Sequence, residues 1–416
     1  LGLKANDATV YSHTPQVAFD GTNVLTLNIS SATQWMDPLS HAITFNVNNR
    51  SNAPLQFVSS NPAILFRRME CRFGGCLIDD ITDFNRLSQL FTLYQSTGKR
   101  LQTGNLGFGT REDMFKDAAT DYVTPQLFRS EEHFSKPIPA NGSKRVVMKL
   151  DLCSFLNQNH WIPLWALSGG IDIRLTLADP RSDTILNAGG RTNSASYALE
   201  NIAFSASMKS IDSALHEMYF KQLAERGSLL IHCKAYSHNT TYLSPAGTGD
   251  FAVQITKPVS RLSTFIASMC PDLTPDEIAD GNQYCNTFIA YAANTENFEA
   301  QLQLGSMRYP DAPIQGYTQA YWRMLQALGI ANSASHDIGV DLRSYSNAQF
   351  AVMITTEKVE GVMSSGQNLQ GGQECRFSVK NFADGGQPAT QMLLRPRVRH
   401  DSRAESGLGD GSQLIV

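Results

Sequence analysis

The stretch Met69-Glu-Cys-Arg-Phe-Gly-Gly-Cys-Leu-Ile78 is the most informative part of this sequence. Hydrophobic and polar residues alternate up to a Gly-Gly pair, the pattern of a β-strand that enters a tight turn and returns as a second strand. Residues 79–95 then place apolar side chains at intervals of three and four, which is typical of an amphipathic helix. We therefore predict strand, turn, strand and helix over residues 69–95.

A second copy of this pattern lies in the other half of the chain. Ala300-Gln-Leu-Gln-Leu-Gly-Ser-Met-Arg-Tyr309 again predicts strand, turn and strand, and residues 317–328 again have helical spacing. The turn glycines, Gly74 and Gly305, are 231 residues apart (305 minus 74) in a chain of 416. A two-fold repeat of one β-sandwich unit would produce this pattern, and two unrelated hairpins followed by helices are the alternative.

Period-two alternation is the dominant pattern elsewhere. It gives each segment one apolar and one polar face, as in the antiparallel sheets of a sandwich and unlike buried parallel strands. The clearest segments are 25–29, 43–47, 171–177, 251–255, 300–304 and 376–380. The sequence therefore predicts an all-β fold with a few short helices.

A further helix is predicted over residues 212–226, near the middle of the chain. Met218 and Tyr219 belong to its apolar stripe, and Gly227 follows as a candidate C-cap. Its position indicates a connection between the two halves. Long irregular stretches are expected at 99–125, 178–197 and 271–283.

Composition narrows the class of protein. Charged residues make up only 17% of the chain and hydrophobic residues 42%, so uncharged polar residues fill the difference, which suits many short strands. The formal net charge of −4 does not indicate a nucleic-acid binder by itself. The seven cysteines form no CxxC pair, and we expect reduced thiols. No segment has the pattern of a signal peptide or membrane span, so we expect a soluble protein that is not exported.

No catalytic or cofactor motif is recognisable, and we predict neither an enzyme nor a cofactor. The nearest approach to a metal site, His232 with Cys233 and His238, has no fourth ligand at a fixed spacing. Asp79 and Asp80 could act as an acid and base pair, but we expect them to stabilise the N-terminus of the helix that begins there.

One strongly basic stretch lies near the end of the chain. It contains Arg395, Arg397, Arg399, His400 and Arg403 within nine residues, followed by a small, polar segment. These side chains could contact a nucleic-acid backbone or an acidic surface of another subunit. A solvated strand end with a loose tail is the simpler alternative.

Several segments, in this order, resemble one family. The segments are Met36-Asp-Pro-Leu-Ser-His-Ala-Ile-Thr-Phe45, the region 65–87 with Asp-Asp-Ile-Thr-Asp-Phe-Asn-Arg-Leu at 79–87, residues 162–180, residues 304–310 with 320–325, and 366–373. They are similar to the double jelly-roll major capsid proteins of Polinton-like viruses, adintoviruses and virophages, of the adenovirus and tectivirus capsid lineage. Phe84 stands where that family often has Tyr, and the segment after Pro396 departs from its strand-like endings.

The resemblance implies two tandem antiparallel eight-stranded jelly rolls, at 1–211 and 228–395, with a connecting helix at 212–227 and a C-terminal tail at 396–416. It also implies that three chains form a pseudo-hexameric capsomer that tiles an icosahedral shell in the virion. The expected partners are the chain itself as a homotrimer, neighbouring capsomers, penton and minor or cement capsid proteins, viral DNA through the basic stretch, and an internal membrane. A minor capsid or spike protein of the same fold, and a double β-sandwich glycosidase or carbohydrate-binding protein, are the alternatives.

Overall fold

The computed structural model describes the greater part of the chain. The described residues are 4–11, 16–18, 23–57, 59–109, 136–178, 185–186, 197–226, 230–242, 250–255, 261–271, 298–331, 333, 338–340, 342, 345, 349–357, 366–369, 374–381 and 389–403. In this part of the chain the paired strands are antiparallel, as the alternating segments predicted.

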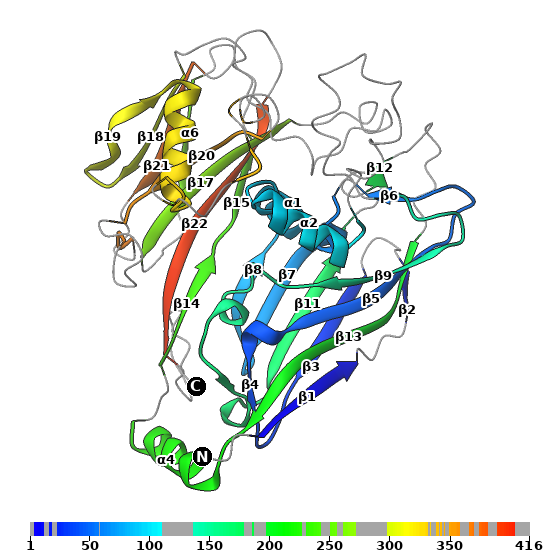
Figure 1. Ribbon diagram of the computed structural model, residues 1–416. Helices are drawn as coiled ribbons and strands as arrows, with labels where there is room; N and C mark the ends of the chain where they lie inside the picture. Colours follow the sequence, from blue (N-terminus) through cyan, green and yellow to red (C-terminus); the bar gives the residue numbers. More distant parts are fainter. Residues whose placement is uncertain are drawn as a thin grey trace.

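The first half forms two facing sheets (Figure 1). In one sheet β1 and β2 pair with β13, which pairs with β5, which pairs with β9, and the other sheet has the order β3-β11-β7-β8. The strands are β1 (Lys4–Tyr11), β2 (Gln16–Ala18), β3 (Val24–Ile29), β4 (Trp35–Met36), β5 (Ala42–Asn49), β6 (Gln56–Phe57), β7 (Phe66–Phe73), β8 (Cys76–Ile81), β9 (Ser143–Met148), β10 (Ile162–Pro163), β11 (Ile171–Leu177), β12 (Ile185–Leu186) and β13 (Tyr197–Ser210).

The second half repeats this arrangement. One sheet has the order β14-β22-β17-β20, with β15 also paired to β22, and the other has the order β16-β21-β18-β19. The strands are β14 (Leu230–Tyr236), β15 (Asn239–Tyr242), β16 (Phe251–Ile255), β17 (Leu262–Pro271), β18 (Glu299–Leu304), β19 (Met307–Gln315), β20 (Ala351–Thr355), β21 (Cys375–Lys380) and β22 (Ala389–Arg403).

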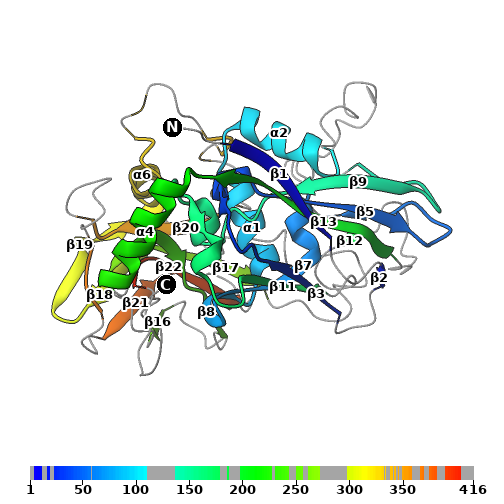
Figure 2. The same ribbon diagram turned by 90° about the horizontal axis from the view of Figure 1, so that it is seen from below.

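Both halves have the jelly-roll topology. When the eight main strands of each half are counted in chain order, from β1 to β13 and from β14 to β22, their sheets read 1-8-3-6 and 2-7-4-5. This arrangement of two antiparallel sheets is a jelly roll, so the predicted double jelly roll is confirmed. The two sandwiches lie side by side, as the two views show (Figures 1 and 2).

The two turn glycines that indicated the repeat occupy equivalent positions. Gly74 and Gly305 both have positive φ, 56° and 58°, which glycine adopts without steric cost. The N–H of Gly74 donates to the carbonyl of Gly170 at 2.9 Å, and that of Gly305 donates to the carbonyl of Glu374 at 2.8 Å. Each acceptor directly precedes the seventh strand of its jelly roll, so each turn is tied to its sheet in the same way.

Strand alternation explains the cores. Every second residue of β3, β5 and β11 is buried, while the residues between them are exposed or partly exposed. In the first jelly roll the ring of Phe45 packs edge-on against that of Phe66 at 5.9 Å, and in the second Phe265 packs against Phe377 at 5.0 Å. Each pair joins residues from the two sheets of one sandwich, so each half has its own apolar interior.

The helices agree with the predictions in part. They are α1 (Phe84–Leu93), α2 (Thr97–Leu106), α4 (Ser213–Arg226) and α6 (Gly316–Ala327), with short 3-10 turns η1 (Pro38–Ser40), η2 (Pro62–Leu65), η4 (Phe155–Asn157) and η5 (Leu164–Ala166). The irregular stretch expected at 99–125 is wrong over 99–106, which belong to α2. Two glycines and two threonines weaken the helical signal there, while the Ser96 hydroxyl caps the helix by accepting from the Lys99 N–H at 3.3 Å.

The other predicted loops lie mostly outside the described residues. Of residues 178–197 and 271–283, the structure describes Pro271 at the end of β17, Ala178, Ile185 and Leu186, which form β12, and Tyr197, which begins β13. The part of the first loop from residue 110 to 125 is also outside the description.

The helix α4 follows the first jelly roll directly, as predicted for residues 212–226. Only part of its apolar stripe is covered. The Tyr219 ring packs on the Trp35 ring, with the ring centres 5.1 Å apart, whereas Met218 is 56% exposed. Phe220 is 60% exposed and lies 6.3 Å from the ring of Trp165. In the part of the chain that the structure describes, no helix is long and apolar enough to cross a membrane.

Candidate functional site

The helix α1 lies between the two jelly rolls (Figure 1). All of its residues except Phe91 are buried, including polar ones such as Asn85, Arg86 and Gln89. An amphipathic helix on one sandwich would keep its polar face in water, so the amphipathic prediction is incomplete. The second jelly roll covers the face of α1 that the first leaves open, and we call this contact the seam.

Apolar and backbone contacts form one part of the seam. The Phe91 ring of α1 packs on the Tyr236 ring at the end of β14, with the ring centres 5.9 Å apart. The hydroxyl of Tyr94, at the C-terminal end of α1, donates to the carbonyl of Gln349 in the second jelly roll. Burial raises the pKa of this phenol, so it remains a donor over the physiological pH range. These contacts fix the end of α1 against the second jelly roll.

A backbone contact extends the seam toward α2. The N–H of Gly339 in the second jelly roll donates to the carbonyl of Gln95 at 3.2 Å. A Cβ at Gly339 would lie 2.7 Å from the guanidinium of Arg100, a buried residue of α2. Glycine at 339 therefore lets the second jelly roll approach α2 closely.

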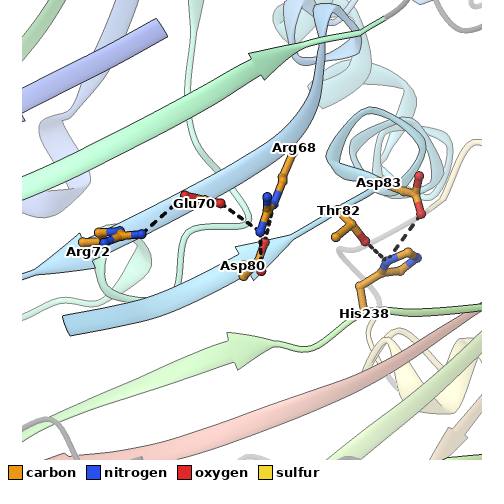
Figure 3. Close-up of polar contacts among 7 residues, drawn as sticks. All are labelled: Arg68, Glu70, Arg72, Asp80, Thr82, Asp83 and His238. Carbon is orange, nitrogen blue, oxygen red and sulfur yellow. Dashed lines mark hydrogen bonds and ion pairs between the residues drawn. The ribbon is translucent and has the colours of Figure 1, made fainter. Parts of the chain in front are cut away.

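A histidine forms the polar part of the seam (Figure 3). The Nδ1 atom of His238, in the link between β14 and β15, lies 3.1 Å from the Thr82 hydroxyl and 3.6 Å from a carboxylate oxygen of Asp83. Thr82 and Asp83 join β8 to α1, so the imidazole contacts the start of the buried helix. The His238 side chain is 1% exposed. It therefore contributes to joining the two jelly rolls and offers no access to a ligand from solvent.

A network of charged side chains covers the outer face of β7 and β8 (Figure 3). The Arg68 guanidinium donates to both carboxylate oxygens of Asp80 at 2.8 Å and lies 2.8 Å from Glu70. Arg72 extends the network at 4.0 Å from Glu70. Because the Arg68 side chain is 42% exposed, solvent screens these pairs and their net contribution is small.

Asp79 and Asp80 lie in β8, so the prediction that they begin a helix is wrong. Alternation within the strand separates them: Asp80 faces Arg68 on the outside, whereas Asp79 is buried. One Asp79 oxygen accepts from the N–H and the hydroxyl of Ser154, both at 2.7 Å. Burial raises the pKa of Asp79 to about 6, and the bonds from Ser154 oppose that shift. The partner of Asp80, Arg68, lies in β7, and the partner of Asp79, Ser154, lies 75 residues away in the sequence. The local sequence around the two aspartates indicates neither contact.

The five basic residues of the predicted contact all lie in one strand. Arg395, Arg397, Arg399, His400 and Arg403 belong to β22, which pairs with β14 on one side and β17 on the other. Residues 396–403 therefore continue a strand of the sheet, and the predicted start of the tail at 396 is corrected to a position beyond Arg403. The boundary at 396 came from the resemblance, because the segment after Pro396 departs from the strand-like endings of that family. In the structure this segment pairs with β14 and with β17.

The register places this strand next to the seam. The Cα of Arg397 pairs with that of Tyr236, whose ring packs on Phe91 of the first jelly roll. The structure thus locates the basic residues in a central strand of the second jelly roll. Which partner their side chains contact, a genome or another subunit, stays a prediction.

The other candidates for chemistry do not converge. Among the residues that the structure describes, no three His, Cys, Asp or Glu side chains form a group that could hold a metal ion. Of the candidate group at 232–238, His238 contacts Asp83. Buried thiols at Cys71 and Cys153 have pKa values raised by burial, so they remain protonated and unreactive.

Sequence analysis did not identify the residues of the seam, because they come together only in the tertiary structure. One signal is present: Tyr236-Ser237-His238 matches Tyr11-Ser12-His13 in the first half. The two copies are 225 residues apart (236 minus 11), so a search for short repeats between the two halves would have found them.

No family model matches this sequence, and no curated protein matches it. The fold, however, is similar to solved viral structures. PBCV-1 VP54, in a crystal structure fitted into a cryo-EM reconstruction of the virophage Sputnik, superposes with a TM-score of 0.60 at 11% identity, covering 96% of this chain and 94% of that chain.

Two further structures agree with this result. The Faustovirus major capsid protein has a TM-score of 0.57 at 9% identity and covers 96% of this chain and 90% of its own. A chain of the quasi-atomic model of the PBCV-1 virus capsid has a TM-score of 0.54 at 12% identity, with 96% and 94% covered. At these identities the similarity establishes the fold: nearly the whole chain shares its double jelly-roll architecture with viral capsid proteins.

Proposed function

We propose that this chain is a major capsid protein, that three copies form a pseudo-hexameric capsomer, and that capsomers tile an icosahedral shell in the virion. The observation that carries the proposal is the pair of jelly rolls with identical strand order, joined side by side by a buried helix. Three chains of two similar units present six similar units around one axis. The similarity to capsid proteins over 96% of the chain supports the same function.

The strand pairing supports the division that we propose. We place the first jelly roll at 1–211, the connecting helix at 212–227, and the second jelly roll from 228 to 403, with the tail after it. Each of the four large sheets pairs strands from one half only. The low fraction of charged residues supports extensive contact between copies, because uncharged polar groups are buried at lower cost when they are hydrogen-bonded.

The role is mechanical rather than catalytic. The repeated arrangement is a scaffold of sheets, and the buried polar residues His238 and Asp79 make hydrogen bonds within it. A minor capsid or spike protein would share the fold and differ in copy number. The glycosidase or carbohydrate-binding alternative gains no support from the structures that share the fold.

Electron microscopy and sedimentation of the purified chain test this proposal. We expect trimers with a pseudo-hexagonal outline. A chain that stays monomeric at high concentration would contradict the capsid function. Quantitative mass spectrometry of assembled particles separates the major protein from a minor or spike protein by copy number.

The proposal also includes partners other than the chain itself. Penton and minor or cement proteins, viral DNA and an internal membrane are those that the resemblance implies. For DNA, the basic residues of β22 are the proposed contact, and the test is salt-dependent binding by a variant with Arg399 and Arg403 replaced by Gln. Because residues 396–403 are part of the sheet, a truncation that tests the tail should begin after Arg403. Unchanged DNA binding in both variants would exclude this contact.

A further inference from the structure

The helices α1 and α6 occupy equivalent positions but have different surroundings. Each follows the fifth main strand of its jelly roll, β8 or β19. Whereas α1 is buried except for Phe91, only Gly316, Ala320 and Met324 of α6 are buried. Trp322, on the outer side of α6, is 46% exposed. The second jelly roll therefore has an uncovered surface where the first has the seam.

A hollow lies at the first turn of α6. It has a volume of about 500 Å³ and is lined by Gln315, Gly316, Tyr317, Thr318, Gln319 and Trp322. At the corresponding place in the first jelly roll, the start of α1, His238 contacts Thr82 and Asp83. The hollow at α6 is thus the counterpart of the site at the start of α1 that His238 of the same chain occupies.

The sequence contains a second copy of the segment that fills this place in the seam. Tyr236 is the last residue of β14 and pairs with Arg397 of β22, and Ser237 and His238 directly follow it. Tyr11 is likewise the last residue of β1, which pairs with β13 in the same way, and Ser12-His13 follow it in the sequence. The first jelly roll therefore carries the same tripeptide at the end of the equivalent strand.

We propose that the outer face of α6, from Gln315 to Trp322, binds the first jelly roll of a second copy of this chain. Tyr11-Ser12-His13 of that copy would take the place that Tyr236-Ser237-His238 hold within the chain. This inference rests on the proposed function, since it names the contact that closes the trimer. It repeats the seam three more times around the capsomer, between chains instead of within one.

The positions of the two surfaces suit a closed ring. In Figure 1, α6 lies at the upper left of the molecule, and β1 and β2 lie on the opposite side, at the lower and middle right. A contact between two different surfaces of the same chain is heterologous, and it forms a closed ring when the rotation between copies completes a circle. A contact between two copies of the same surface is isologous and would not form such a ring of three.

The chemistry of the hollow also fits this segment. Trp322 offers an exposed aromatic face to a tyrosine, as Phe91 does to Tyr236. Amide and hydroxyl groups of Gln315, Thr318 and Gln319 stand where the seam has Thr82 and a carboxylate. A neutral histidine can donate to or accept from such groups, so this contact needs no ion pair.

Sedimentation velocity of the full chain over a concentration series tests the inference, with the variant W322E. We expect W322E to raise the dissociation constant of the trimer by at least about 30-fold, because a large aromatic side chain at the centre of an interface is a typical hot spot. F220E is the matched control, since Phe220 is also an exposed aromatic on a helix, α4, but lies outside the proposed contact. Unchanged far-UV circular dichroism establishes that both variants fold.

The partner surface is tested by Y11A, for which we expect weaker association of similar size. A chain with both W322A and Y11A should associate little worse than either single variant, because both changes remove the same contact. Trimers that persist in W322E, or an equal loss in F220E, would overturn this inference and leave the capsid proposal standing. A wild-type chain that never associates would overturn both.

Discussion

The substitution Asp79→Asn tests the physical interpretation of the buried polar group in β8. Asp79 is 2% exposed, and one of its oxygens accepts two hydrogen bonds of 2.7 Å from Ser154. Burial raises its pKa from 3.8 to about 6 because the charged form loses its hydration. Asparagine retains an acceptor for Ser154 but carries no charge.

The sign and size of the effect follow from this shift. The folded protein keeps the proton of Asp79 up to about pH 6, whereas the unfolded chain releases it near its ordinary value of 3.8. Below that value the residue carries no electrostatic penalty, and the penalty is complete once the pH rises through about 6. A shift of roughly two units corresponds to a loss of about 3 kcal/mol of unfolding free energy across this window. The amide introduced by D79N does not titrate, so the variant should not show this loss.

Urea unfolding followed by tryptophan fluorescence measures the effect. Three of the four tryptophans, Trp35, Trp161 and Trp165, lie in the first jelly roll, so a W322F background makes the signal report on that half. The stability difference between D79N and its parent should be about 2.5 kcal/mol larger at about pH 8 than at about pH 4, where the unfolded carboxyl is already partly ionised. Comparing two pH values cancels any constant cost of the new amide.

A pH-independent difference between D79N and its parent would refute this reasoning. Ser154→Ala is the companion variant, because it removes a hydrogen bond that favours the charged carboxylate. It should move the fall in stability to a higher pH. A shift in the opposite direction would show that the Ser154 hydroxyl does not act on Asp79 in this way.

Three other variants test the turn, the seam and the surface network. In Gly170→Ala, the new Cβ would lie 2.4 Å from a carbonyl oxygen of β3 at a residue with positive φ, so we expect the free energy of unfolding to fall by more than about 3 kcal/mol in thermal unfolding. For Gly75→Ala, whose new Cβ would have no atom within 4 Å, we expect a loss of about 1 kcal/mol. Equal losses in the two variants would contradict this reasoning. Tyr94→Phe removes the hydrogen bond across the seam, so we expect the free energy of unfolding to fall by about 1 to 3 kcal/mol and amide hydrogen exchange in β20 to become faster. Unchanged exchange in β20 would contradict this expectation. Arg68→Ala should cost less than about 1 kcal/mol in urea, and a much larger loss would show a network that solvent does not screen.

Local patterns were sufficient for most of the strands. Segments such as 43–47 and 171–177 alternate in sequence and in burial, because a sheet with one face in the core imposes that period. The spacing of Gly74 and Gly305 also predicted the repeat, since both turns need a backbone that glycine adopts freely. The errors at Asp79, Asp80 and residues 396–403 arise because partners distant in sequence outweigh a local preference. At α2 the helix forms despite its glycines and threonines, with a cap from Ser96.

The sequence by itself thus determined that the chain is all-β, with two similar halves and short helices after equivalent hairpins. Only the tertiary structure decided that α1 is buried except at Phe91 while α6 is open. The residues that cover α1, Tyr236, His238 and Gln349, follow it by more than 140 positions. Helical periodicity records which face of a helix is apolar. It carries no information about a polar face covered by a second sandwich, where hydrogen bonds such as that between Thr82 and His238 replace water.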